Sequence, residues 1–312
     1  MAGQRLPVLQ DADSSIKKRP KTRLPEWFRV SLPTGESLNA FNKIKSTITE
    51  NTLNTVCVEA RCPNIHECWS RGTATFMIAG QECTRGCRFC AVGSIKTPPP
   101  LDEDEPRNLA LAVKNMNLEH AVITVVNRDD LSDSGAAHYR KCIEKVREVC
   151  PETSLELLCS DLAGDKNALS VLLKNLELDV FAHNVECVPR LDSRVRDKRA
   201  SFNQSLDILR WAKELRPEII TKSSIMVGLG ETDDEIIKAM ILLREVNCDI
   251  ITIGQYLQPN KKLLPVDRFP NPEKFKEWDI LAKEMGFLGA ACGPLVRSSY
   301  RAGILYRKIT RN

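Results

Sequence analysis

Three cysteines on one short stretch have a spacing that suits metal chemistry. Cys83, Cys87 and Cys90 follow the pattern C-x3-C-x2-C, and Gly86 allows a sharp turn between the first two. Thiolates this close together, with backbone amides directed at the sulfides, can hold three corners of a [4Fe-4S] cluster. The fourth iron then stays open to bind a substrate, as a catalytic zinc keeps one open position. A zinc knuckle is the alternative interpretation. If the cluster forms, Phe89 is expected to shield it from water.

A second cysteine triple lies just upstream. Cys57, Cys62 and Cys68 have the spacing C-x4-C-x5-C, and this triple ends 15 residues before the other begins. Zinc sites more often show paired C-x2-C spacing, but His66 offers a fourth zinc ligand. Spacing alone therefore leaves zinc and a second iron–sulfur cluster both open. We expect residues 57–72 to form a loop around a metal.

From residue 73 onward, strand-like and helix-like segments alternate. Such alternation implies parallel strands joined by right-handed crossovers, as in a full or partial (β/α) barrel or a doubly wound sheet. We predict an α/β fold with a partial (β/α)6-type TIM-like barrel, an N-terminal cluster-binding extension and a short C-terminal segment. The expected strands are Ala74–Ala79, Ala121–Val126, Leu155–Cys159, Val180–His183, Thr221–Val227, Ile250–Ile253 and Leu288–Ala291. The expected helices are Pro106–Asn117, Ala137–Val149, Lys166–Leu176, Phe202–Leu215, Asp233–Val246 and Pro272–Met285.

In a barrel of this kind the chemistry lies on the loops after the C-terminal ends of the strands. The loop of Cys83, Cys87 and Cys90 follows the first expected strand. Asn127-Arg128-Asp129-Asp130 follows the second; these residues either bind substrate or cofactor or form a local ion pair. Gly228-Leu229-Gly230-Glu231 follows the fifth; this turn either brings the backbone close to a ligand or only leads into a helix.

The composition narrows the class of protein. The 312 residues carry a formal charge of +4 without a dense basic block interleaved with aromatics, so we expect no nucleic-acid partner. No apolar run reaches the length of a membrane span. The first residues lack an apolar signal stretch and carry two early aspartates, so they look like neither a secretory signal nor a transit peptide. We therefore expect a cytoplasmic protein with no membrane partner. The cysteines outside the two triples are expected to be small core residues, namely Cys142, Cys150, Cys159, Cys187, Cys248 and Cys292.

A set of motifs extends from about residue 25 to 305. It comprises VCVEARCPNIHECWSRGTATFMIAGQECTRGCRFC, VNRDDL, Lys222 with MVGLGET, GQYLQP, and ACGPLVRSSY. Together these motifs resemble the lipoyl synthase family of the radical S-adenosylmethionine superfamily. Radical enzymes in general do not combine both cysteine triples with a terminal Arg-Ser-Ser-Tyr. The rival interpretations are a methylthiotransferase, which also carries an auxiliary cluster, and a zinc-stabilised binding module without catalysis.

The resemblance implies two [4Fe-4S] clusters and S-adenosylmethionine as cofactors. The triple of Cys83, Cys87 and Cys90 would hold the cluster that cleaves S-adenosylmethionine to a 5′-deoxyadenosyl radical. The triple of Cys57, Cys62 and Cys68 would hold an auxiliary cluster, which the family consumes as its sulfur source. Its fourth ligand would be a serine, assigned to Ser299 with Ser298 as the near alternative. A serine oxygen binds iron less well than a thiolate, which suits a cluster that must come apart.

The resemblance also implies contacts with S-adenosylmethionine. The candidates lie on the glycine-rich turn and at the end of the fourth strand, and are Gly228, Gly230, Glu231, Asn184 and Glu186. The chain departs from the family pattern in two places. Ala182 stands where the family usually has asparagine, and Leu157-Leu158-Cys159-Ser160 replaces a more polar strand end with proline.

The implied reaction inserts two sulfur atoms, at C6 and C8, into an octanoyl chain on a lysine of a lipoyl-carrier domain. Expected partners are octanoylated carriers (2-oxoacid dehydrogenase E2 or glycine-cleavage H protein), a low-potential donor such as ferredoxin or flavodoxin, and an iron–sulfur carrier for cluster repair. The basic arm Lys17–Arg23 is expected to help an acidic carrier dock. The predicted parts are an arm and auxiliary-cluster loop (1–72), the barrel (73–293) and a segment supplying the serine ligand (294–312).

Overall fold

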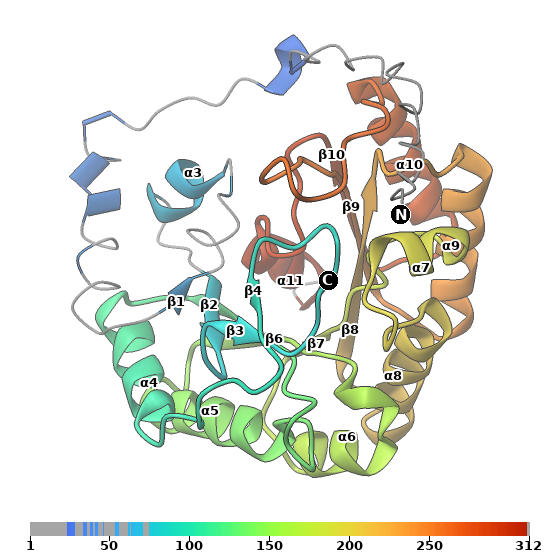
Figure 1. Ribbon diagram of the computed structural model, residues 1–312. Helices are drawn as coiled ribbons and strands as arrows, with labels where there is room; N and C mark the ends of the chain where they lie inside the picture. The colour runs from blue at the N-terminus through green and yellow to red at the C-terminus, as the bar shows by residue number, and fades with distance from the viewer. Residues whose placement is uncertain are drawn as a thin grey trace, which may run out of the picture.

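A curved sheet surrounded by helices forms the body of the molecule in this computed structural model (Figure 1). The structure describes residues 24–28, 34, 35, 38, 39, 41, 42, 46, 54, 55, 62, 64–70 and 75–310. Cys57, the basic arm 17–23 and most of the expected N-terminal part therefore lie outside the described residues. None of the described helices is long and apolar enough to cross a membrane.

The main sheet is largely parallel. In the described residues its strand order is β1-β2-β5-β6-β7-β8-β9-β10, and each neighbouring pair from β2 to β10 is parallel, whereas β1 pairs antiparallel with β2. Because β1 and β10 are its edges, the sheet is a partial barrel, as predicted. The strands are β1 (Asn54–Thr55), β2 (Thr75–Ile78), β5 (His120–Val125), β6 (Ser154–Leu158), β7 (Val180–Ala182), β8 (Ile220–Val227), β9 (Ile250–Gln255) and β10 (Gly289–Gly293).

The crossover helices lie outside the sheet, and their starts are specified by local sequence. Thr232 and Glu235 form a capping box at the start of α9, Ser201 caps α8, and Asn271 caps α10 just before its first residue, Pro272. The predicted crossover helices are confirmed with small shifts at their ends: α4 (Glu105–Asn115), α5 (Ala136–Val149), α6 (Lys166–Leu173), α8 (Phe202–Leu215), α9 (Asp233–Glu245) and α10 (Pro272–Glu284).

The C-terminal helix α11 (Ala302–Thr310) was not predicted, and it packs across the N-terminal ends of the strands. The hydroxyl of Tyr306 donates to Asp179 Oδ1 (3.0 Å), directly before β7. A Cβ on Gly303 would lie 2.8 Å from the Cβ of His120, the first residue of β5, so this close approach requires glycine. The segment 294–301 joins β10 to α11, and its Ser299 contacts Thr75 of β2.

Three further features differ from the expectations. The segment expected as a metal loop contains helix α3 (Ile65–Ser70), because Ile65 N–H bonds to the carbonyl of Cys62 and starts a turn. Strands β3 (Glu82–Cys83) and β4 (Gly93–Ser94) form a separate parallel pair around the cysteine loop. Five of the scattered cysteines are buried, as predicted, but Cys292 is only partly buried because it lies on the edge strand β10.

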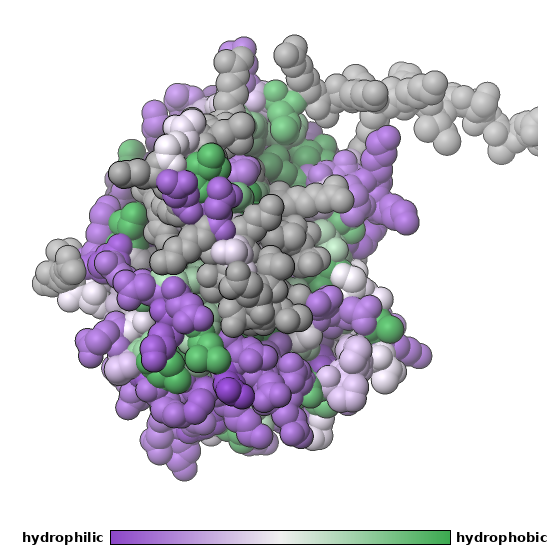
Figure 2. All heavy atoms as spheres, turned by 90° about the vertical axis from the view of Figure 1, so that its left-hand side faces the viewer, coloured by the Kyte–Doolittle hydropathy of each residue, from purple (hydrophilic) through white to green (hydrophobic). Residues whose placement is uncertain are grey.

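Short elements complete the fold: η1 (Glu26–Phe28), η2 (Leu162–Gly164), η3 (Pro189–Leu191) and α7 (Asp192–Val195). Figure 2 shows the side of the molecule that carries α3. Hydrophilic residues gather over the lower part of this face, where α4 lies in Figure 1, and hydrophobic residues are visible there only in small groups.

Candidate functional site

The loop after β2 carries Cys83, Cys87 and Cys90, all with free and partly exposed thiols. Backbone N–H groups point at two of the sulfurs. Arg85 N and Asn127 N donate to Cys83 Sγ (3.4 and 3.3 Å), and Asp197 N donates to Cys87 Sγ (3.3 Å). Such N–H···S bonds stabilise thiolate sulfur and are typical of iron–sulfur sites.

Burial raises the pKa of the Cys87 thiol to about 11 and that of Cys90 to about 12, with smaller contributions from the neighbouring thiols and from Glu186. The metal-free thiols are therefore protonated at neutral pH, and metal binding must release their protons. Phe89 is partly buried and packs against the core formed by β8, β9, α9 and their neighbours.

Buried ion pairs fix the conformation of this loop. Arg85 is 4% exposed and donates to Asp129 (2.7 Å) and to Asp161 (2.6 Å), which lie after β5 and β6. Thr84 Oγ1 also donates to Asp129 (2.6 Å). Burial alone would raise the pKa of Asp129, but the bonds from Arg85 and Thr84 lower it below its usual value. The carboxylate therefore stays charged and holds the loop.

Arg128 and Asp130 form a second local pair, joined by two hydrogen bonds of 2.9 and 2.8 Å. The sequence left two roles open for Arg128, Asp129 and Asp130. In the structure Arg128 and Asp130 form the local ion pair, whereas Asp129 pairs with Arg85 on the cysteine loop.

A further contact comes from the segment after β7, which the sequence analysis missed. Asp197 Oδ2 accepts from Gly86 N (2.9 Å), and Arg199 Nη2 donates to the carbonyl of Thr84 (2.6 Å). The hydrogen bonds from Arg199 hold the pKa of Asp197 well below its usual range. The only local signal for this segment was the alternation of acidic and basic residues in DSRVRDKR.

Asn184 and Glu186 lie beside the cysteine loop at the end of β7. Asn184 Nδ2 donates to Glu186 Oε1 (3.2 Å), and Glu186 has a left-handed backbone with φ of 66°. Among the described residues no group donates to the buried Oδ1 of Asn184. Burial raises the pKa of Glu186, and Arg196 opposes this effect. A ligand with a protonated amine would satisfy both groups.

The glycine-rich turn after β8 is organised by its own acid. The Glu231 carboxylate accepts from Gly228 N (2.7 Å) and Leu229 N (2.9 Å), so both of its oxygens are directed into the turn. Gly228 has φ of 95°, and a Cβ there would lie 2.6 Å from the carbonyl of Arg268. Gly230 has φ of 109°. Gly228, Leu229 and Glu231 are buried, and Gly230 is the partly exposed residue of the turn.

A second site lies where α3 meets the C-terminal segment. One small cavity is lined by residues of both, namely Cys62, Asn64, Ile65, Cys68, Thr75, Arg297, Ser299 and Tyr300. Thr75 Oγ1 donates to Ser299 Oγ (2.9 Å). Ser298, the alternative ligand, and His66, the possible zinc ligand, are not among the lining residues. The ring of His66 instead lies 4.9 Å from that of Phe41.

Side-chain hydrogen bonds join the two halves of this site. Asn64 Nδ2 donates to the carbonyl of Leu295 (2.6 Å). Glu67 accepts from the hydroxyl of Tyr300 (3.1 Å) and from Arg301 Nη2 (2.8 Å). Two of these residues lie next to a candidate ligand in the sequence, because Glu67 precedes Cys68 and Tyr300 follows Ser299.

One cationic side chain lies beside the thiols that line the cavity. Burial raises the pKa of the Cys62 thiol, and the nearby Arg297 opposes the shift. Burial lowers the pKa of Arg297, and Cys62 opposes that shift in turn. A cationic guanidinium beside buried thiols favours the thiolates that a metal requires.

Comparisons with known proteins give a consistent result. The chain matches the family model of the radical SAM superfamily over residues 77–243 and that of the N-terminal domain of lipoyl synthase over residues 8–62. It is 48% identical to mitochondrial lipoyl synthase of Bos taurus, covering 94% of this chain and 79% of that one. It is 51% identical to chloroplastic lipoyl synthase 2 of Populus trichocarpa, covering 91% and 72%.

Solved structures resemble the chain in fold. Methylornithine synthase superposes with a TM-score of 0.53 at 13% identity, covering 82% of this chain and 78% of that one. The FeFe-hydrogenase maturase of Carboxydothermus hydrogenoformans gives 0.52 at 13% identity, covering 88% and 78%.

The expected cytoplasmic location is wrong. Similar chains from Bos taurus, Xenopus laevis and Homo sapiens are named mitochondrial, and that from Populus trichocarpa is named chloroplastic, so these relatives are named for organelles and not for the cytoplasm. The expectation rested on first residues that look like neither a secretory signal nor a transit peptide. That interpretation of the N-terminus does not decide the compartment.

Proposed function

The chain belongs to the lipoyl synthase family and is a radical S-adenosylmethionine enzyme, and from this premise we propose which of its residues hold the cofactors. It catalyses the insertion of two sulfur atoms into an octanoyl chain carried by a lipoyl-carrier domain. Iron–sulfur clusters and S-adenosylmethionine supply the electron, the radical and the sulfur when they are bound.

We assign the initiating [4Fe-4S] cluster to Cys83, Cys87 and Cys90. The support is the set of three free cysteines on one loop that buried ion pairs hold in place, called the braced loop below. The sulfurs of Cys83 and Cys87 accept hydrogen bonds from backbone N–H groups. The chain's own contribution is to hold these sulfurs in place with Arg85, which ties the loop to Asp129 and Asp161.

We assign a second [4Fe-4S] cluster to Cys57, Cys62, Cys68 and Ser299. The observation that carries this assignment is the cavity that Cys62 and Cys68 share with Ser299, more than 200 residues along the chain. Cys57 enters on the cysteine spacing alone. The contacts of Glu67 and Asn64 with the segment 294–301 bring the serine to the cysteines, and Arg297 supplies a compensating positive charge.

S-adenosylmethionine would lie against the ends of β7 and β8. Asn184 and Glu186 fit its amino group, because no residue that the structure describes donates to Asn184 Oδ1, and Glu186 is close enough to Cys87 and Cys90 to influence their thiols. Gly228 and Gly230 would offer backbone contact. Glu231 would act indirectly, by holding the turn through its bonds to Gly228 N and Leu229 N.

The chain's partners follow from this chemistry. Lipoyl synthases act on lipoyl-carrier domains, and we propose the 2-oxoacid dehydrogenase E2 or the glycine-cleavage H protein as carrier. A ferredoxin or flavodoxin would donate electrons, and an iron–sulfur carrier would rebuild the second cluster. We retain the division into 1–72, 73–293 and 294–312, in which the last part supplies Ser299 from the segment between β10 and α11.

The assignment of the serine is tested with two variants of adjacent residues. After anaerobic reconstitution the natural chain should hold about eight irons, and Ser299→Ala should hold the second cluster less tightly than Ser298→Ala does. Mass spectrometry of an octanoylated carrier peptide should then show a gain of two sulfurs with Ser298→Ala and almost none with Ser299→Ala. Equal behaviour of the two variants would refute the assignment of Ser299. One bound zinc without labile sulfide would refute both clusters.

A further inference from the structure

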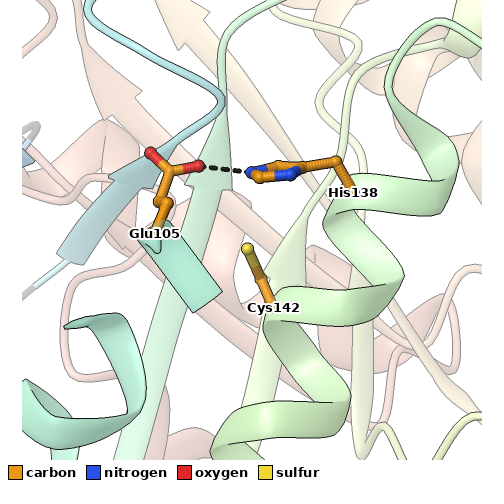
Figure 3. A group of neighbouring side chains, drawn as sticks. All are labelled: Glu105, His138 and Cys142. Carbon is orange, nitrogen blue, oxygen red and sulfur yellow. Dashed lines mark hydrogen bonds and ion pairs between the residues drawn. The ribbon is translucent and has the colours of Figure 1, made fainter. Parts of the chain in front are cut away.

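A largely buried polar cluster lies at the base of the loop that carries Cys83, Cys87 and Cys90. It consists of Glu105, at the start of α4, and His138 and Cys142 on α5 (Figure 3). Glu105 Oε2 lies 2.5 Å from His138 Nε2. In the part of the chain that the structure describes, these three are the one group of potential metal ligands whose ligand atoms all lie within 4.8 Å of one another.

The backbone that Glu105 holds is that of Ala79, where the cysteine loop begins. Ala79 N–H donates a hydrogen bond of 2.8 Å to Glu105 Oε2, the same oxygen that faces His138. This bond spans 26 residues and joins the first residue of the loop to the residue at its end. All three cysteines of the initiating cluster lie between these two points.

The conformation of Ala79 is unusual and has to be supported. Its φ is 69°, and Gly80 follows with φ of 102°, so two consecutive residues are left-handed. A left-handed backbone costs a residue with a Cβ about 1 kcal/mol or more of free energy. Such a residue keeps this conformation only where contacts with its surroundings stabilise it. The turn directs the chain from β2 toward Cys83, so its geometry affects where that sulfur lies.

A second group holds Ala79 from its other side. Arg128 Nη1 donates to the carbonyl of Ala79 (3.2 Å), and Arg128 is itself fixed by its two bonds to Asp130. The N–H of Ala79 is therefore paired with the partly buried Glu105, and its carbonyl with the buried Arg128.

We propose that Glu105 is a positioning residue, oriented by His138, that closes the base of the cysteine loop and so sets the position of the initiating cluster. The proposal rests on the proposed function, because it takes Cys83, Cys87 and Cys90 as cluster ligands. The buried Cys142 fills the space beneath the pair. The alternative is a metal ion held by all three side chains. Glu105 Oε2 already accepts from Ala79 N–H and lies 2.5 Å from His138 Nε2, so an ion would have to displace both contacts.

Substitution by glutamine separates the two possibilities. A glutamine carbonyl oxygen at the place of Oε2 can still accept from both N–H donors, but it is a far weaker ligand for a transition metal. We therefore expect Glu105→Gln to behave like the natural chain. Glu105→Ala should lose the hydrogen bond that ties Ala79 to the end of the loop. Glu103→Ala is the matched control, because Glu103 is exposed on the same loop.

The first measurement is hydrogen exchange of the segment 76–90 in the metal-free protein. Glu105→Ala should exchange at least about tenfold faster there, the equivalent of roughly one hydrogen bond, whereas Glu105→Gln and Glu103→Ala should not. The second is the electron paramagnetic resonance spectrum of the reduced holoenzyme with and without S-adenosylmethionine. In Glu105→Ala the spectral change on adding S-adenosylmethionine should need about tenfold more of it.

The proposal is overturned if Glu105→Ala matches Glu103→Ala in both measurements. It is also overturned if the purified natural chain holds one zinc ion that Glu105→Gln has lost. A natural chain that exchanges as expected but never cleaves S-adenosylmethionine would instead refute the proposed function, because the exchange experiment needs no cluster.

Discussion

The two candidate cluster sites are built in different ways. The loop of Cys83, Cys87 and Cys90 is held from the ends of several barrel strands, through Asp129 after β5, Asp161 after β6 and Asp197 after β7. The site of Cys62, Cys68 and Ser299 lies between α3 and the segment 294–301, and hydrogen bonds between these two peripheral segments and from Thr75 hold it together.

This difference suits the two tasks. A cluster that initiates each reaction has to survive every turnover, and a scaffold of parallel strands with buried ion pairs keeps its ligands in place. A cluster that gives up its sulfur must be opened and rebuilt. A ligand set divided between two segments at the edge of the sheet can separate without disturbing the barrel.

The largest effect should follow from removing one thiol of the braced loop. Cys87→Ala leaves two thiolates for a cluster that needs three, so the initiating cluster and all cleavage of S-adenosylmethionine should be lost. Because the sites share no ligand, the second cluster should stay. Iron analysis should fall from about eight to about four per chain. Loss of all iron would contradict the independence of the two sites.

The sequence predicted the barrel for definable reasons. Alternating apolar segments specify parallel strands, and the loop of Cys83, the pair Asn184 and Glu186, and the glycine-rich turn each follow a strand, so topology brings them to one end of the sheet. The supports of the loop could not be predicted in this way. Asp161 and Asp197 contact it across 76 and 111 residues, and no local pattern marks such contacts.

Short helices escaped prediction for a similar reason. The six residues of α3 cover less than two turns, too few for a helical period to be recognised among the cysteines. Ser299 was assigned from a family resemblance. The contact of Ser299 with Thr75 was not predicted. It forms only because the C-terminal segment lies beside β2 in the folded chain.

An intermediate effect should follow from breaking the buried ion pairs of the braced loop. Arg85→Met would leave Asp129 and Asp161 without their shared cation, and breaking a buried pair in this way costs about 3 kcal/mol. The free energy of unfolding of the metal-free protein should fall by that amount. Hydrogen exchange of the backbone amides in the loop of Cys83, Cys87 and Cys90 should become faster by a much larger factor than hydrogen exchange in α3.

Arg85→Lys is the matched control. It keeps the charge, but a single ammonium cannot donate in fixed directions to two carboxylates. Arg85→Lys should therefore lose less free energy of unfolding than Arg85→Met does. Its loop amides should still exchange hydrogen nearly as fast as those of Arg85→Met. If Arg85→Met destabilised both sites equally, the contrast between a braced and a peripheral site would be wrong.

The smallest effect should come from Thr75, at the second site. Its hydroxyl is 2.9 Å from Ser299 Oγ, and once Ser299 is a deprotonated ligand only Thr75 can donate in this bond. Thr75→Val removes the donor at nearly constant shape, whereas Thr75→Ser keeps it. The lost bond is worth about 1 kcal/mol, so Thr75→Val should change the rate at which a chelator strips the second cluster by about fivefold and leave the first unchanged. A Thr75→Ser chain that behaves like Thr75→Val would show that packing, and not the hydrogen bond, sets the lability of this cluster.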